Sequence, residues 1–184
     1  INNFDGWIAR ARNDKSKDMR TLLRDYVEML IDTGARPGKE LLDLKWRQIK
    51  FAIKPTITKT DAVDEDGDAI ELANLNRSVE MTVTGKTGTR TIVGMRRTVQ
   101  VLERIAKRIY DIDDSITNPI AKLTTGSNND EVFRVKDDRE LNSLQQMFES
   151  YLKEHNLLID KRTGQKRVFY SLRHTYATLA LTHD

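Results

Sequence analysis

One segment in the middle of the chain constrains the fold more than any other. Residues 78–84 (SVEMTVT) alternate apolar and polar side chains, residues 85–88 (GKTG) follow, and residues 89–93 can return as a partner strand. A period of two is typical of a half-buried strand, and a short connection that contains glycine is typical of a hairpin. The segment therefore predicts a β-hairpin that any fold of this chain has to accommodate.

Segments with helical periodicity surround this hairpin. Their apolar residues recur every three or four positions; these segments are residues 16–33, 96–110 and 138–157. Gly34 predicts the end of the first helix. Pro37 suits the first position of another helix over residues 37–46, and a last helix is expected to begin at Ser171. The sequence thus predicts one domain that is mainly α with a small antiparallel β-sheet, an α+β fold.

A further strand signal precedes the hairpin. Residues 49–53 alternate, and Pro55 is expected to interrupt the strand. Residues 61–71 hold six acids and no base, and we expect a loop or a hairpin tip there. This stretch resembles a calcium-binding loop, but Ala62 and Ala73 occupy its first and twelfth ligand positions. The sequence therefore predicts no metal site here.

Composition narrows the class of protein. The 184 residues include no cysteine, which excludes disulfides and thiolate metal sites. No apolar run approaches the roughly 18 residues of a membrane span, so we expect a cytoplasmic protein without a membrane partner. The net charge is +3, and the acidic stretch leaves the remainder more basic, which suits a polyanionic partner. A mildly basic surface without any such partner explains the charge more simply.

The predicted last helix carries a cation where its dipole disfavours one. With Ser171 as N-cap, Arg173 falls in the first turn, beside unpaired backbone N–H groups. A cation there costs about 0.3–1 kcal/mol, and an anion in front of the helix reverses the sign. The residues expected on the inward face of this helix are Leu172, Tyr176 and Leu179.

A second arginine is placed in the same way. Arg36 directly precedes Pro37, at the expected start of a helix. The planar guanidinium matches a phosphate, so Arg36 and Arg173 together favour binding of a phosphate group. Pairing with nearby carboxylates such as Glu40 or Asp32 explains Arg36 equally well, and the sequence leaves both readings open.

Lys86 lies at the expected hairpin tip. Its GKT triplet is not a nucleotide-binding phosphate loop, because Glu80 stands where that motif needs glycine and a strand follows instead of a helix. A lysine at a hairpin tip is usually solvated, but a flexible tip can also deliver its ammonium group into a cleft.

These segments together resemble the catalytic domain of the tyrosine recombinases, the phage-integrase family. The similar segments are residues 33–46 (TGARPGKELLDLKW), 82–93 (TVTGKTGTRTIV) and 170–179 (YSLRHTYATL), in the family's order. The resemblance implies that residues 16–184 are part of an integrase catalytic domain and that residues 1–15 are a linker remnant. It also implies a prophage or phage origin, double-stranded DNA and other recombinase protomers as partners, and no cofactor or metal.

The resemblance further implies site-specific DNA recombination. Such enzymes cleave and rejoin DNA through a 3′-phosphotyrosyl intermediate. Arg36 and Arg173 would clamp the phosphate, Lys86 would protonate the leaving oxygen, and Glu40 would hold Arg36 in place. The DNA-binding residues implied by the resemblance are Arg36, Lys86, Arg90 and Arg173.

Two positions depart from the family. Tyr170 stands where the family has histidine, and a phenol with a pKa of about 10 donates a hydrogen bond but shuttles protons poorly. Glu40 follows Arg36 by four residues, where much of the family has three. His174 matches a supporting position, and a histidine bonded to the backbone is the alternative.

The nucleophilic tyrosine is expected outside this sequence. The family places it downstream of the helix that carries the second arginine, and the sequence ends at Asp184. The tyrosines expected on packing faces, and so unsuited to this role, are Tyr26, Tyr110, Tyr151 and Tyr176. We therefore expect a fragment that does not cleave DNA and is monomeric or nearly so. The rival hypotheses are a non-catalytic DNA-binding relative and an unrelated helical protein–protein module.

Overall fold

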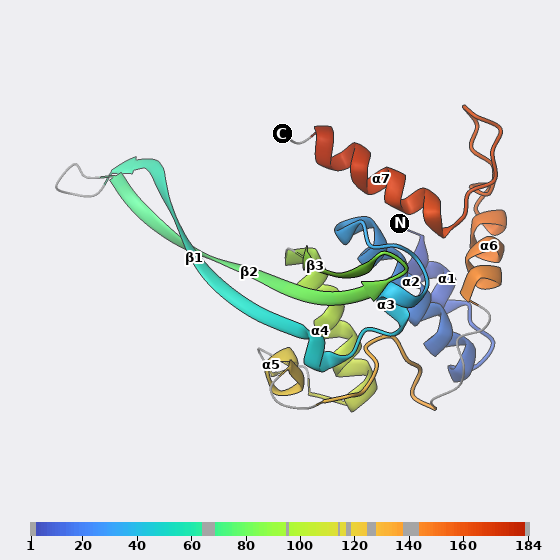
Figure 1. The fold of residues 1–184 in the computed structure, drawn as a ribbon, viewed down its shortest axis with the longest axis horizontal. Coiled ribbons are helices and arrows are strands. Elements are labelled where there is room, and N and C mark those ends of the chain that lie inside the picture. Colours follow the sequence, from blue (N-terminus) through green and yellow to red (C-terminus); the bar gives the residue numbers. More distant parts are fainter. Residues whose placement is uncertain are drawn as a thin grey trace.

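The structure is a computed structural model that describes residues 3–63, 69–94, 96–113, 115–116, 119–124, 128–137 and 144–182, and the side chains in these ranges other than those of residues 52–76 and 122. The elements are, in chain order, α1 (Phe4–Ala9), α2 (Asp14–Thr33), α3 (Lys39–Leu42), the 3-10 turn η1 (Trp46–Gln48), β1 (Ile49–Val63), β2 (Ala69–Gly85), β3 (Gly88–Gly94), α4 (Arg96–Tyr110), α5 (Pro119–Thr124), α6 (Leu144–Glu154) and α7 (Phe169–Thr182). Helices with one three-stranded antiparallel sheet confirm the predicted α+β class (Figure 1).

The sheet has the strand order β1-β2-β3. The predicted hairpin is β2–β3, with Gly85 paired to Gly88 around the turn. The prediction that Pro55 interrupts a strand is wrong, because β1 continues to Val63 and Pro55 is paired with Leu75. Proline is tolerated there since β1 is an edge strand, where no ladder hydrogen bond is needed on the outer side. In Figure 1, β1 and β2 extend together well beyond β3.

Part of the acidic stretch lies in this long pair of strands. Residues 61–63 belong to β1 and residues 69–71 belong to β2. The tip between them, residues 64–68, lies outside the described residues. The sequence predicted a loop or hairpin tip over all of residues 61–71, whereas both ends of this stretch are in strands.

Local signals set the ends of the longer helices. The side chain of Asn13 caps α2 by accepting the Ser16 N–H at 2.8 Å, and Gly34 ends the helix with a left-handed φ of 61°. The predicted helix over residues 96–110 is confirmed as α4. The predicted helix over residues 138–157 is described from Leu144 as α6; it ends at Glu154, three residues earlier than predicted, and Asn156 has a left-handed φ of 56°. Residues 138–143 lie outside the described residues.

The core lies where α2 and α4 meet the sheet, and α1 belongs to it. Phe4 and Trp7 of α1 are buried against Tyr151 of α6, and the Phe4 and Tyr151 rings stack at 3.9 Å. The indole of Trp7 donates a hydrogen bond to Glu154 at 2.9 Å. Residues 4–9 therefore pack into the same core as the rest of the chain. Within the described ranges, every helix is too short or too polar to cross a membrane.

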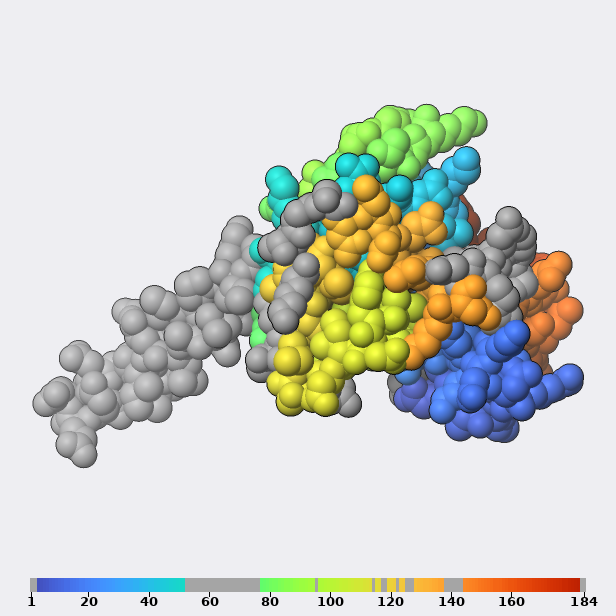
Figure 2. Space-filling model, turned by 90° about the horizontal axis from the view of Figure 1, so that it is seen from below, coloured from blue at the N-terminus to red at the C-terminus, as the bar shows by residue number. Residues whose placement is uncertain are grey.

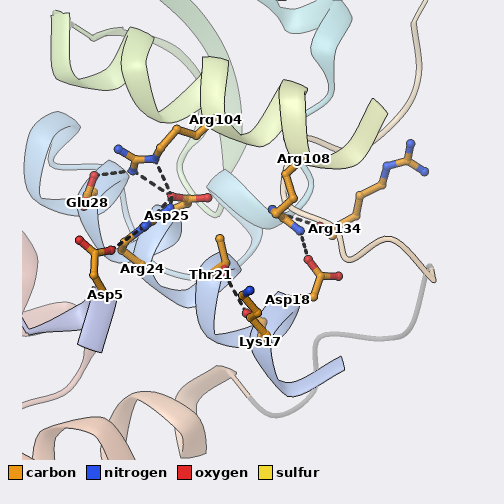
Figure 3. Close-up of polar contacts among 10 residues, drawn as sticks. All are labelled: Asp5, Lys17, Asp18, Thr21, Arg24, Asp25, Glu28, Arg104, Arg108 and Arg134. Carbon is orange, nitrogen blue, oxygen red and sulfur yellow. Dashed lines mark hydrogen bonds and ion pairs between the residues drawn. The ribbon is translucent and has the colours of Figure 1, made fainter. Parts of the chain in front are cut away.

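A buried ion network ties α2 to α4 (Figure 3). Asp25 of α2 is fully buried and accepts hydrogen bonds from Arg24 and from Arg104 of α4, the latter at 2.9 Å. Arg104 also donates to Glu28 at 2.6 Å. Burial raises the pKa of Asp25, and the neighbouring arginines oppose that shift. On the face shown in Figure 2, α4 (yellow-green) lies beside the blue N-terminal helices. The network thus fixes α2, whose C-terminal end leads into the site described next.

Candidate phosphate-binding site

The loop that follows α2, residues 34–38, is the centre of the site. Gly34 and Gly38 have left-handed φ angles of 61° and 96°. Gly38 is therefore not helical, and α3 begins only at Lys39. The predicted helix over residues 37–46 is wrong in length, because α3 ends at Leu42. Arg36 consequently lies on a loop and not at the first turn of a helix.

Glu40 of α3 is the buried acid of the site. Only 4% of Glu40 is exposed, and its Oε2 accepts the backbone N–H of Arg36 at 2.9 Å and Nη2 of Arg90 at 2.8 Å. Its Oε1 lies 3.4 Å from Nη1 of Arg36. Burial acts to raise the pKa of Glu40, but the hydrogen bonds from Arg36 and Arg90 outweigh it and the pKa is lowered. Glu40 is thus an ionised carboxylate shared by two arginines.

The tip of the β2–β3 hairpin is docked on this pair. Nη1 of Arg36 donates to Oγ1 of Thr87 at 2.6 Å. A Cβ added at Gly85 would lie 2.6 Å from Oε1 of Glu40, so the strand packs directly on the carboxylate. Lys86 lies between these two residues, is exposed, and lines an open pocket of about 420 Å³ together with Lys39. The hairpin turn therefore places Lys86 on a pocket that Glu40 also lines, and Thr87 joins the same turn to Arg36.

Arg173 reaches the same loop from the other end of the chain. Its guanidinium donates to the backbone carbonyl of Gly34. The prediction that Ser171 caps the last helix is wrong, because α7 begins at Phe169 and the Ser171 hydroxyl accepts the Val168 N–H at 3.1 Å. Arg173 thus lies one turn inside α7 and is directed at the loop, not at the free N–H groups of its own helix.

The face of α7 differs from the predicted inward seam. Leu172 packs against the core, but 37% of Tyr176 and 42% of Leu179 are exposed. The Tyr176 ring lies against Gly34, where an added Cβ would be 2.3 Å from Cδ1 of the ring. Figure 1 shows α7 lying across the top of the fold, with its C-terminal half away from the other elements. Only the first half of α7 therefore packs as the periodicity suggested.

Tyr170 and His174 form a pair on the surface of α7. Tyr170 is half exposed, and its ring meets the His174 ring edge to face at 5.4 Å. Within the described residues, the His174 imidazole makes no hydrogen bond to the backbone, which was the alternative to a supporting role. Both side chains are therefore open to a ligand, and no contact joins them to Arg36.

The other tyrosines are buried or hydrogen-bonded. Tyr26 and Tyr151 are buried, and the Tyr110 hydroxyl donates to Asp130 at 2.7 Å. Tyr26 supports the site, because its hydroxyl accepts the Gly38 N–H at 2.7 Å. Burial raises the pKa of Tyr26 to about 12. Sequence reasoning missed Tyr26, which it treated only as a core residue.

Other contacts of the site were also missed. Thr87 was not singled out, although it follows Lys86 directly, and Gly34 was treated only as a helix stop. Of the readings left open for Arg36, the structure shows pairing with a carboxylate, which is Glu40, since Asp32 instead accepts the Thr98 N–H at 3.0 Å. Phosphate binding by Arg36 stays a prediction. Among the described residues, no cluster of three or more His, Asp or Glu side chains is arranged to hold a metal ion.

The comparisons with known proteins add no relative. No protein-family model matches the chain, and no curated protein matches it. Arg173 binds Gly34, Arg36 follows two residues later on the same loop, and the hairpin turn that carries Lys86 is bonded to Arg36 through Thr87.

Proposed function

We propose that this chain is part of the catalytic domain of a tyrosine-type site-specific DNA recombinase, an integrase of phage or prophage type that acts in the cytoplasm on double-stranded DNA. One observation carries the proposal: Arg173 is bonded to the five-residue loop that carries Arg36, 137 positions earlier in the sequence, and the hairpin turn with Lys86 is docked on Arg36 through Thr87. The site then binds one phosphate of the DNA backbone.

The arginines retain donors for such a phosphate. Arg36 uses Nη1 for Glu40 and Thr87, while its Nε and Nη2 make no hydrogen bond within the described residues. Its side chain is 37% exposed, so these donors are accessible from solvent. A guanidinium held by a buried carboxylate is pre-organised, and donors fixed in advance stabilise the charge that grows on a phosphoryl group in the transition state.

The remaining residues take narrower roles in this proposal. Lys86 is the general acid for the leaving 5′-oxygen, because it is an exposed ammonium on the pocket lined by Glu40, the carboxylate that holds Arg36. Tyr170 donates a hydrogen bond to a phosphate oxygen. None of the buried or bonded tyrosines, Tyr26, Tyr110 or Tyr151, is assigned as the nucleophile. For the chain as given, the proposed activity is therefore phosphate-directed DNA binding, and strand exchange takes place with other protomers.

DNA affinity measured over a range of salt tests this proposal. Fluorescence anisotropy with a 30-base-pair duplex gives the slope of log K against log[KCl], which changes by about 0.9 for each phosphate contact. We expect Arg36→Ala and Arg173→Ala each to lower affinity and to reduce the slope by about that amount. Arg162→Ala is the matched control, since Arg162 is exposed and its side chain makes no hydrogen bond or ion pair within the described residues.

The outcomes separate the hypotheses. Binding that ignores salt, or equal slopes for all three variants, contradicts a phosphate clamp and favours a protein-binding helical module. Loss of slope in Arg36→Ala and Arg173→Ala, with none in Arg162→Ala, supports the clamp.

A further inference from the structure

Arg90 of β3 differs from the other arginines of the site in what it contacts. Its Nη2 donates to Oε2 of Glu40 at 2.8 Å, and this same oxygen accepts the backbone N–H of Arg36. Its Nε is buried and has no hydrogen-bond partner within the described residues. Arg90 is thus directed toward the buried carboxylate from outside the loop, whereas Arg36 belongs to the loop and Arg173 donates to the loop carbonyl of Gly34.

The charges around Glu40 show what Arg90 contributes. Glu40 is almost fully buried, and a buried carboxylate needs close cationic or hydrogen-bond partners. Arg90 supplies the shorter contact, because Nη1 of Arg36 lies 3.4 Å from Oε1. Without Arg90, Glu40 would keep Arg36 as its one close cation and draw that guanidinium inward, away from a ligand.

We infer that Arg90 is a positioning residue that acts through Glu40: it neutralises the buried carboxylate and so leaves the outer donors of Arg36 for a DNA phosphate. The inference rests on the proposed function and changes the role of Arg90, which the resemblance implies to be a direct DNA contact. Strand pairing supports it, since Arg90 of β3, two residues after Gly88 of the turn, lies opposite the buried Val83 of β2.

The same salt titration tests this role with Arg90→Ala, Arg90→Lys and the double variant Arg90→Ala/Glu40→Gln. We expect Arg90→Ala to lower affinity for the 30-base-pair duplex about tenfold, the size of one lost charge-assisted hydrogen bond. The complex would still form the contact between Arg36 and the phosphate, after pulling the guanidinium back from Glu40, so the salt slope should equal that of the wild type, whereas Arg36→Ala loses about 0.9. Arg90→Lys keeps a cation beside Glu40 and should bind nearly as well as the wild type.

The double variant distinguishes a positioning role of Arg90 from a role in stability alone, because only a positioning role predicts that DNA affinity is restored. Glu40→Gln removes the charge that draws Arg36 inward, so it should restore most of the affinity lost in Arg90→Ala. Thermal unfolding of each variant shows that the compared proteins are folded, and if Arg90→Ala does not fold, the comparison of Arg90→Lys with the double variant replaces it.

Three results overturn the inference. They are a slope that falls in Arg90→Ala as it does in Arg36→Ala, an affinity that Arg90→Ala leaves unchanged, and a double variant that binds no better than Arg90→Ala. In each case Arg36→Ala still reports on the clamp, so the proposed function is tested separately from this inference. Wild-type binding that ignores salt overturns the proposed function and this inference together.

Discussion

Gly34→Ala is the sharpest test of how α7 reaches the site. Gly34 has a φ of 61°, and an L-residue in that conformation costs about 1–2 kcal/mol. The new Cβ would also lie 2.3 Å from the Tyr176 ring, so the ring or α7 has to move. If the ring loses about 60 Å² of buried apolar surface, a further ~1.5 kcal/mol is lost. We therefore predict a loss of about 3 kcal/mol in the free energy of unfolding.

Gly164→Ala is the matched control for this prediction. Gly164 has a similar φ of 69°, but nothing lies within 4 Å of an added Cβ, so only the backbone cost of about 1–2 kcal/mol applies. Urea unfolding measures both variants, and the duplex titration measures their DNA affinity. We expect only Gly34→Ala to weaken DNA binding, because Arg173 is bonded to the Gly34 carbonyl. Equal losses of stability and unchanged DNA affinity in both variants would refute the reasoning.

The remaining predictions concern the core and two ionisable groups. Phe4→Ala should lower the free energy of unfolding by about 3–5 kcal/mol in a single urea transition, because Phe4 is buried and stacked on Tyr151; a loss under 1 kcal/mol would show that α1 is not part of the core. Tyr26→Phe should cost about 0.5–1.5 kcal/mol, the net worth of a hydrogen bond, since the half-buried Gly38 N–H loses its acceptor. The wild type should also show a tyrosine that titrates near pH 12 in ultraviolet absorbance. Hydrogen bonds from the Thr163 N–H and Arg167 lower the pKa of Asp160 to about 2. The contribution of Asp160 to stability is therefore present above its unfolded pKa of 3.8 and is lost as the pH falls through about 2. A carboxyl titration of Asp160 by NMR with a midpoint near 3.8 would contradict this.

Much of the secondary structure follows from short-range signals. Gly34 ends α2 where the sequence predicts it, because a left-handed residue after a helix needs no information from the rest of the fold. The same holds for α4 and for the β2–β3 hairpin, whose periodicity and turn residues are local. These elements are predictable because residues close to one another in the sequence determine them.

The errors occur where distant parts of the chain decide the conformation. Pro55 reads as a strand breaker, yet it is tolerated because β1 lies at the edge of the sheet. Pro37 reads as the start of a helix, but Gly38 adopts a φ of 96° while its N–H is held by Tyr26. The spacing of apolar residues along the sequence predicts neither the position of a strand in its sheet nor this long-range hydrogen bond.

The candidate site shows the same division. The contact between Arg36 and Glu40 spans four positions and was one of two pairings considered from the sequence alone. The bonds from Arg90 to Glu40 and from Arg173 to Gly34 cross 50 and 139 positions, and no local pattern indicates either partner. The charged residues of the site were therefore singled out from the sequence, whereas Tyr26, Thr87 and the long-range hydrogen bonds were not.

The most direct test of the central claim is to locate a bound oxyanion by anomalous diffraction from crystals soaked in tungstate, a phosphate mimic. We predict one tungstate in hydrogen-bond contact with both Arg36 and Arg173, beside the turn that carries Lys86. Tungstate bound only elsewhere on the molecule, with neither arginine in contact with it, would contradict a shared phosphate site.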